Sequence, residues 1–144
     1  MFTNTITLFN LHKATGLWHP VVIKGADVIE AKSSNVSAHG KINTSVIDIL
    51  VNCSSAKVVK TESGDKQYIG PKAYAKCENP ENYLTFTPEN DFIFEGVWPD
   101  LSPAAEDDYE SGLYHELNDN YDGVYMISSA AFYGLIPHFE IGGK

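Results

Sequence analysis

The sequence predicts a mainly β protein, a small β-barrel or sandwich with one short helix at about residues 104–119. Two observations lead to this fold class. Short segments rich in β-branched and aromatic residues recur along the chain, separated by turn residues. Only one segment has the spacing of apolar residues that a surface helix needs. At 144 residues the chain has the length of one domain, so residues 1–144 are expected to share a single core.

The first half of the chain predicts strands joined by short turns. Ile6 and Leu8 alternate with threonines, which is typical of a strand with one buried face. The run at residues 44–52 is apolar on both faces, so we expect it in the middle of a sheet or barrel. The turn at residues 62–65 has hairpin composition. The expected strands are 3–12, 18–29 with a break at Gly25, 44–52, and a hairpin containing 58–59 and 68–69.

The second half adds a short helical turn, a second hairpin and two further strands. Residues 71–77 are a short, lysine-bearing segment and predict the helical turn. The aromatic segments 83–87 and 92–98 flank Pro-Glu-Asn-Asp and predict a hairpin. Residues 124–127 predict one more strand, and the alternation across 132–141 predicts another. The total is about seven or eight short strands.

The expected helix lies in the acidic part of the chain. Pro103 suits a first helical turn, and Asp107-x-x-Glu110 resembles a capping box. Leu113 and Leu117 are one turn apart, so one face can dock on the sheet. Gly112 is unfavourable inside a helix and weakens this prediction.

Charge is distributed unequally between the two halves of the chain. All ten basic residues are lysines; residues 1–76 carry a balance of +4 and residues 77–144 a balance of −13. A chain with no arginine lacks the side chain that binds phosphate and guanine in bidentate fashion, so we expect no sequence-specific nucleic-acid binding. The same asymmetry suits a basic surface of one copy meeting an acidic surface of the next. Simple solubility also explains the excess of acids.

The sequence predicts neither a membrane protein nor a secreted one. No run approaches the length that spans a bilayer, and the first residues lack the regions of a secretory signal. Cys53 and Cys77 have neither metal-site spacing nor the density of a disulfide scaffold. They are expected to be free thiols.

Enzymatic and metal-binding alternatives rest on weak patterns. His12 and His19 with Asp27 or Glu30 are candidate metal ligands, although scattered histidines are more often structural. Cys53 is a candidate nucleophile with His115 or His138 as its base, although any chain with several cysteines and histidines offers such pairs. The chain has no phosphate loop and no nucleophile elbow. We therefore predict no cofactor and no enzymatic activity.

Segments at both ends resemble an uncharacterised family of short proteins of tailed phages and prophages of Gram-positive bacteria. The opening MFTNTITLFN, followed by LWHPVVIK, and the ending IPHFEIGGK carry the resemblance, and YIGPK and NDFIFEG in the middle also fit it. The resemblance covers nearly the whole chain, and its terminal motif is the most specific part. It implies a place among head–tail joining proteins, and it brings no catalytic residues.

The resemblance leads to a functional prediction: a structural protein of the head–tail neck, such as a head-closure (stopper) or connector subunit. Such a protein is expected in the virion, as a homo-oligomeric ring that touches portal-side and tail-side proteins. A tail terminator and a capsid-decorating module remain as alternatives. Two polar segments, 33–41 and 100–108, are the candidate contacts. Their candidate contact residues are Ser34, Asn35, His39, Lys41, Glu106, Asp107 and Asp108.

Overall fold

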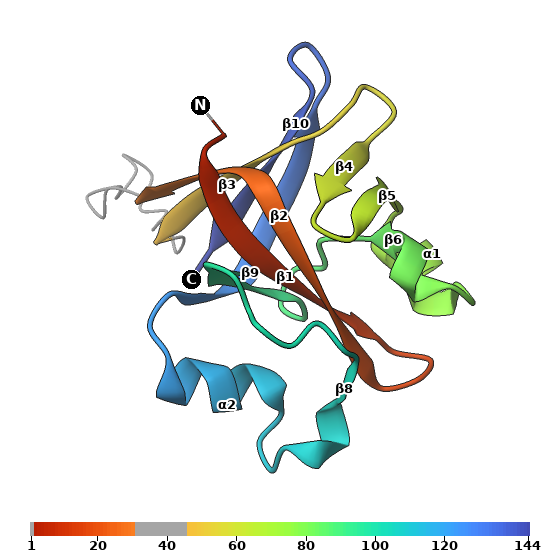
Figure 1. Cartoon of the computed structure of the whole chain (residues 1–144), viewed down its shortest axis with the longest axis vertical. Helices are drawn as coiled ribbons and strands as arrows, with labels where there is room; N and C mark the ends of the chain where they lie inside the picture. Colours follow the sequence, from red (N-terminus) through yellow and green to blue (C-terminus); the bar gives the residue numbers. More distant parts are fainter. Residues whose placement is uncertain (1, 31–45) are drawn as a thin grey trace, which may run out of the picture.

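The computed structural model describes residues 2–30 and 46–144 and has a closed six-stranded antiparallel β-barrel at its centre. Strands account for 48% of the chain and helices for 16%, which confirms the mainly β prediction. The strand order is β1–β7–β9–β10–β3–β2, and β2 pairs again with β1 to close the barrel (Figure 1). The barrel strands are β1 (Asn4–His12), β2 (Leu17–Glu30), β3 (Ile47–Asn52), β7 (Phe92–Glu95), β9 (Val124–Tyr133) and β10 (His138–Gly143).

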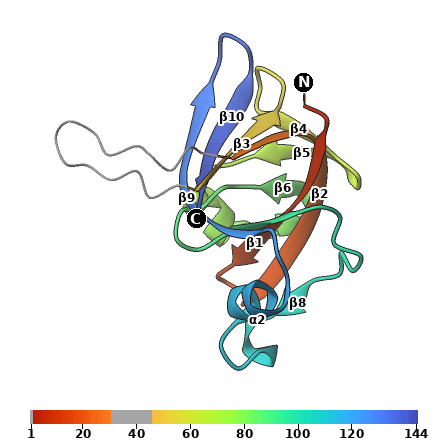
Figure 2. The ribbon, with the colours of Figure 1, turned by 90° about the vertical axis from the view of Figure 1, so that its left-hand side faces the viewer.

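Two smaller groups of elements attach to the barrel. One is a three-stranded sheet of β4 (Val58–Thr61), β5 (Gly64–Tyr68) and β6 (Tyr83–Leu84), with α1 (Pro71–Lys76) and the short 3-10 helix η1 (Pro80–Asn82) beside it. The other contains β8 (Ala104–Ala105), the 3-10 helix η2 (Glu106–Asp108) and α2 (Leu113–Asn120). Figures 1 and 2 show α2 at one end of the molecule and the β9–β10 hairpin at the other.

The long strand β2 closes the barrel because it pairs with two other barrel strands. Its first part pairs with β1, and its last five residues pair with β3. Between Ile23 and Ala26 the strand contains one residue more than the partner segment of β1. Such a bulge bends and twists a strand. The expected break at Gly25 is therefore a bulge inside one continuous strand.

Two apolar clusters hold the fold together. The first fills the barrel and the space under the small sheet; Ile6, Leu8 and Ile141 belong to it. The second lies outside the barrel wall, where Phe9, Trp18 and Phe92 meet the helix residues Leu113 and Leu117. β1 contributes to both clusters, since successive side chains of a strand point to opposite faces. Leu113 and Leu117 dock as the sequence predicts.

The terminal motif of the chain contains a glycine that tight packing requires. A Cβ atom at Gly143 would lie 2.8 Å from Ile47 Cγ2 and 3.1 Å from Tyr125 Cβ. Gly143 sits in β10 between β3 and β9, where it pairs with Ile47 and Ile127. Only a residue without a side chain lets the neighbouring side chains approach this closely.

The prediction of a helix at about residues 104–119 is wrong in its start. Residues 104–105 form a short strand beside β2, residues 106–108 form a 3-10 turn, and the helix begins at Leu113. The expected capping box at Asp107 and Glu110 does not start this helix, because Asp107 lies in the 3-10 turn and the helix begins only at Leu113, beyond that turn. Gly112 is instead the cap residue, with φ +88°, and a Cβ there would meet the Glu106 carboxylate at 2.8 Å. The glycine that weakened the prediction marks the true start.

The second predicted hairpin, at residues 83–87 and 92–98, does not form. β6 pairs in parallel with β5, whereas β7 pairs with β1 and β9. The turn between them is folded by the Asp91 carboxylate, whose Oδ2 accepts a hydrogen bond from the Thr87 backbone N–H at 3.0 Å. The two aromatic segments therefore enter different sheets.

The prediction of one strand across residues 132–141 is also wrong. β9 ends at Tyr133 and β10 begins at His138, so the segment is the tip of a hairpin. Leu135 is 98% exposed at this tip.

The other strand and helix predictions agree with the structure. They cover residues 3–12, 44–52, 58–69, 71–77 and 124–127, of which residues 44 and 45 lie outside the described part. β3 lies between β2 and β10, as expected of a central strand.

Candidate functional site

The structure places some of the predicted contact residues and leaves others outside its range. Ser34, Asn35, His39 and Lys41 lie outside the described residues. Glu106, Asp107 and Asp108 all belong to the 3-10 turn η2 that precedes α2.

Residues 100–122 form a segment that we call the acidic lobe. It contains eight acidic residues and no lysine, a charge balance of −8. All of these carboxylates except that of Glu106 belong to exposed residues. The carboxylates are Asp100, Glu106, Asp107, Asp108, Glu110, Glu116, Asp119 and Asp122. The lobe therefore presents a strongly negative surface at one end of the molecule (Figure 1).

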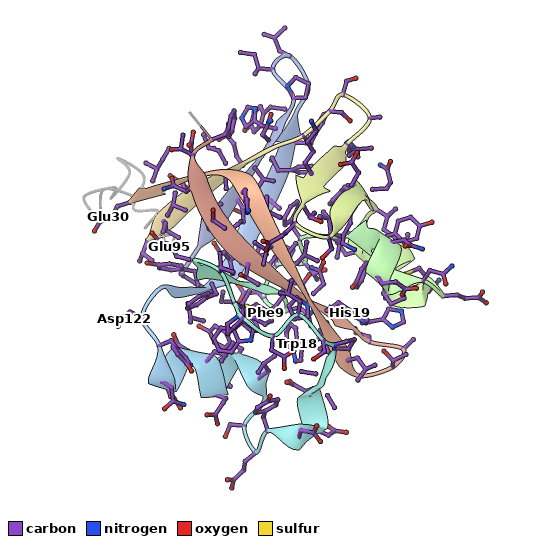
Figure 3. All side chains as sticks on the ribbon, in the orientation of Figure 1. Phe9, Trp18, His19, Glu30, Glu95 and Asp122 are labelled. Carbon is purple, nitrogen blue, oxygen red and sulfur yellow. The ribbon has the colours of Figure 1, made fainter. Side chains whose placement is uncertain are left out.

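Glu106 differs from its acidic neighbours because it anchors the lobe. Its Oε1 accepts hydrogen bonds from Trp18 Nε1 at 2.9 Å and from the Leu113 backbone N–H at 2.8 Å. The second bond satisfies an N–H group at the start of α2, where a carboxylate also complements the helix dipole. Trp18 is 2% exposed and belongs to the same buried cluster as Phe9 (Figure 3). Of the three predicted contacts, only Asp107 and Asp108 are thus free to meet a partner.

We predict that Glu106→Ala lowers the free energy of unfolding by about 2 kcal/mol, because two hydrogen bonds to a charged group are lost. Glu106→Gln keeps one carbonyl oxygen as an acceptor, so it should lower the free energy of unfolding by a smaller amount. The exposed Asp107→Ala should change stability by at most about 0.5 kcal/mol. Urea unfolding followed by tryptophan fluorescence measures all three. Equal values for Glu106→Ala and Asp107→Ala would contradict the anchoring role.

A groove lies between the barrel and the small sheet. Its volume is about 740 Å³, and its lining includes Lys24, Asn52, Cys53 and Lys60. Lys24 is paired with Glu62 at 3.6 Å. Burial raises the pKa of the Cys53 thiol, which disfavours the reactive thiolate. The groove has the size of a small-molecule site, but its thiol is not activated.

Of the candidate metal ligands, His12 and His19 lie together, with ring centroids 6.2 Å apart, but neither Asp27 nor Glu30 joins them as a third ligand. Both ring nitrogens of His12 are engaged: Nδ1 lies 2.9 Å from Thr15 Oγ1, and Nε2 lies 2.8 Å from the Cys77 carbonyl oxygen. Burial lowers the pKa of His19, and nearby His12 lowers it further. Across the described part of the chain, no three His, Cys, Asp or Glu side chains lie close enough to share a metal ion.

One carboxylate, Asp91, is buried inside the fold. Its oxygens accept hydrogen bonds from the Leu11 and Thr87 backbone N–H groups and from the Asn10 and Asn90 side-chain amides. The Asn10 amide also donates to the Thr85 carbonyl oxygen at 2.7 Å. Asp91 thereby joins β1 to the turn before β7. Burial raises the pKa of Asp91 to about 6, and the four hydrogen bonds oppose the rise.

The raised pKa of Asp91 predicts a pH dependence of stability. Between about pH 4 and pH 6 the folded chain holds a proton on Asp91 that the unfolded chain has lost. The stabilisation is complete below about pH 4 and is lost as the pH rises through 6, a change of roughly 3 kcal/mol. Subtracting the unfolding free energies of Asp91→Asn from those of the wild type at each pH isolates this effect. A flat difference between pH 4 and pH 7 would contradict the assignment.

The β9–β10 hairpin carries a surface unlike the acidic lobe. Leu135 and Ile136 at its tip are 98% and 68% exposed. The stem is well ordered by side-chain contacts: Phe132 lies 5.3 Å from Phe139, and Tyr133 stacks on His138 at 5.4 Å between ring centroids. Hydrogen bonds to the Ile136 carbonyl oxygen and the Glu140 carboxylate raise the pKa of His138. This surface was not predicted from the sequence. Its signal is the Gly-Leu-Ile-Pro tetrapeptide, whose first and last residues are typical of a turn.

Fold and surface together define a small closed β-barrel protein with an acidic lobe at one end and an apolar hairpin tip at the other. The chain belongs to a family of unknown function (DUF6751), whose model matches residues 1–144. Neither the curated proteins nor the solved structures contain a match. Within residues 2–30 and 46–144, no helix is both long and apolar enough to cross a membrane.

Proposed function

We propose that the protein is a structural subunit of the head–tail neck of a tailed phage or prophage, acting by assembly with other virion proteins and with copies of itself. A head-closure or connector ring is the form we favour. The observation that carries the proposal is the placement of two unlike surfaces, the acidic lobe and the apolar hairpin tip, at opposite ends of a compact barrel.

Two unlike surfaces are what a subunit between two neighbours needs. A ring that closes through head-to-tail contacts joins one surface of a subunit to a different surface of the next. A neck subunit also needs one surface for each adjoining ring. The resemblance of the opening and terminal segments to phage proteins supports the same setting.

In such a ring the acidic lobe lines the channel. Carboxylates that face a channel repel DNA phosphates, so the duplex passes without adhering. Asp107 and Asp108 are exposed and test this role without disturbing the Glu106 anchor. Lysine at both positions should slow DNA ejection from particles that still assemble. Unchanged ejection would remove the channel role from the lobe.

The proposal is tested by quantitative mass spectrometry of purified phage particles from the strain that encodes this chain. The expected result is the protein at a copy number close to that of the portal protein. Its absence from intact particles would overturn the proposal. A copy number near that of the major capsid protein would instead support a capsid-decorating module, and immunogold labelling would separate the neck from the tail end.

A further inference from the structure

The outer part of β9 is an open edge of the sheet. β9 pairs with β7 only through residues 124–126, and the backbone of Ile127 bonds to Glu89 and Asp91. From residue 129 to residue 133, β10 is its only strand partner within the described chain. Among the described residues, one row of backbone N–H and C=O groups therefore has no strand partner there. Such a row is a template for pairing with another strand.

This edge lacks the features that usually prevent pairing. Proteins protect open edges with charged side chains, prolines or coverings. All seventeen residues between Asp122 and Glu140 are free of Asp, Glu and Lys, the longest such run in the chain. The exposed side chains of this stretch are those of Ser129, Ala131 and Tyr133, and the first two are small, so another strand can approach closely around Ala131. The edge is thus uncharged, uncovered by the described residues and sterically open.

The hairpin is also ordered before any partner arrives. Phe132 packs against Phe139, and the Lys57 ammonium lies 4.8 Å from the centre of the Phe132 ring. His138 is fixed by the Glu140 carboxylate at 3.0 Å and by its stacking on Tyr133. A strand that is already extended loses little conformational freedom on pairing.

We infer that this edge binds a second copy of the chain, by antiparallel pairing of residues 129–133 about a two-fold axis at Ala131. The edge carries no Asp, Glu or Lys, so it is the part of the molecule where two equally charged copies can meet with the least repulsion. Each copy carries a net charge of −9, and the hairpin is the end of the molecule farthest from the acidic lobe. Pairing at the hairpin therefore keeps the two lobes apart, whereas contacts nearer the lobe bring like charges together. In this register Ser129 faces Tyr133 of the other copy and Ala131 faces Ala131.

A lipid surface is the other occupant that an apolar tip suggests. The hairpin has no lysine between Asp122 and Glu140 to hold lipid phosphates, and the chain is acidic. The inference goes beyond the proposed function and does not depend on it. Purified protein tests the contact, whereas the neck assignment is tested in particles, so either can fail alone.

The test places one cysteine at or beside the two-fold axis in a Cys53→Ser, Cys77→Ser background. Directly opposite Cβ atoms are about 5 Å apart in such a pair. Ala131→Cys should therefore cross-link between copies under mild oxidation. Ser129→Cys is the matched control, because the two copies of residue 129 would be about 13 Å apart along the strands. That separation is too long for a disulfide.

Analytical ultracentrifugation supplies the second measurement. The wild type should sediment as a dimer in a concentration-dependent way. Ala131→Lys, which puts two ammonium groups face to face at an exposed position, should weaken association at least tenfold and leave the circular dichroism spectrum unchanged. Equal cross-linking of the two cysteine variants, or a wild type that stays monomeric at its highest soluble concentration, would overturn the inference. A monomer that sediments with phosphatidylcholine vesicles would overturn it in favour of lipid.

Discussion

Asp91→Ala is expected to lower the free energy of unfolding by about 3 kcal/mol at pH 7. Four N–H groups donate to the Asp91 carboxylate, and those of Leu11, Thr87 and Asn10 belong to buried or half-buried residues that would be left without this acceptor. Each unsatisfied buried donor costs about 1–3 kcal/mol, and relief of the buried charge offsets part of the loss. Since a domain is stable by only about 5–15 kcal/mol, this is a large fraction.

The measurement is urea unfolding of Asp91→Ala beside Asp107→Ala, the latter a change at an exposed carboxylate of the same charge. The loss for Asp91→Ala should grow at pH 5, because the wild type is stabilised there by the raised pKa of Asp91. Hydrogen exchange should show the Leu11 and Thr87 amides opening first. A loss under 1 kcal/mol at both pH values would show that water replaces the carboxylate without cost.

Phe92→Ala is expected to lower the free energy of unfolding by about 4 kcal/mol, the usual cost of removing a buried phenyl ring. Phe92 is fully buried, and its ring lies 4.5 Å from that of Phe9, 5.0 Å from Trp18 and 5.4 Å from Tyr114 between centroids. It is therefore the contact point between the barrel wall and the acidic lobe. The cavity left by the missing ring should lower the protection of α2 against hydrogen exchange more than that of the barrel.

Phe92→Leu tests whether the loss comes from the missing side-chain volume. Because leucine keeps most of the apolar volume, this variant should lower the free energy of unfolding by less than half as much as Phe92→Ala. Val97→Ala, at a half-exposed position, is the control and should be nearly neutral. Hydrogen exchange resolved by residue compares α2 with the β1–β2 ladder. Equal loss of protection in both would mean that the lobe and the barrel unfold as one unit.

The sequence by itself determined the class of the fold and most of its strands. Local patterns suffice where a strand has one buried face, as at Ile6 and Leu8, or where two turn residues connect a hairpin, as between β4 and β5. The docking of Leu113 and Leu117 was likewise predictable from their spacing. The excess of acids in the second half of the chain was visible in the composition, and the structure gathers eight of them in one lobe.

The tertiary structure decided what depends on residues far apart in the sequence. The helix starts at Leu113 because Glu106 bonds to its backbone and to Trp18, which is 88 positions away from Glu106. β6 and β7 separate because Asp91 is bound to β1. Within the described part of the chain, β9 lacks a second strand partner beyond its first residues because β7 is short. None of these is a periodic pattern, since each rests on a partner that folding alone brings near.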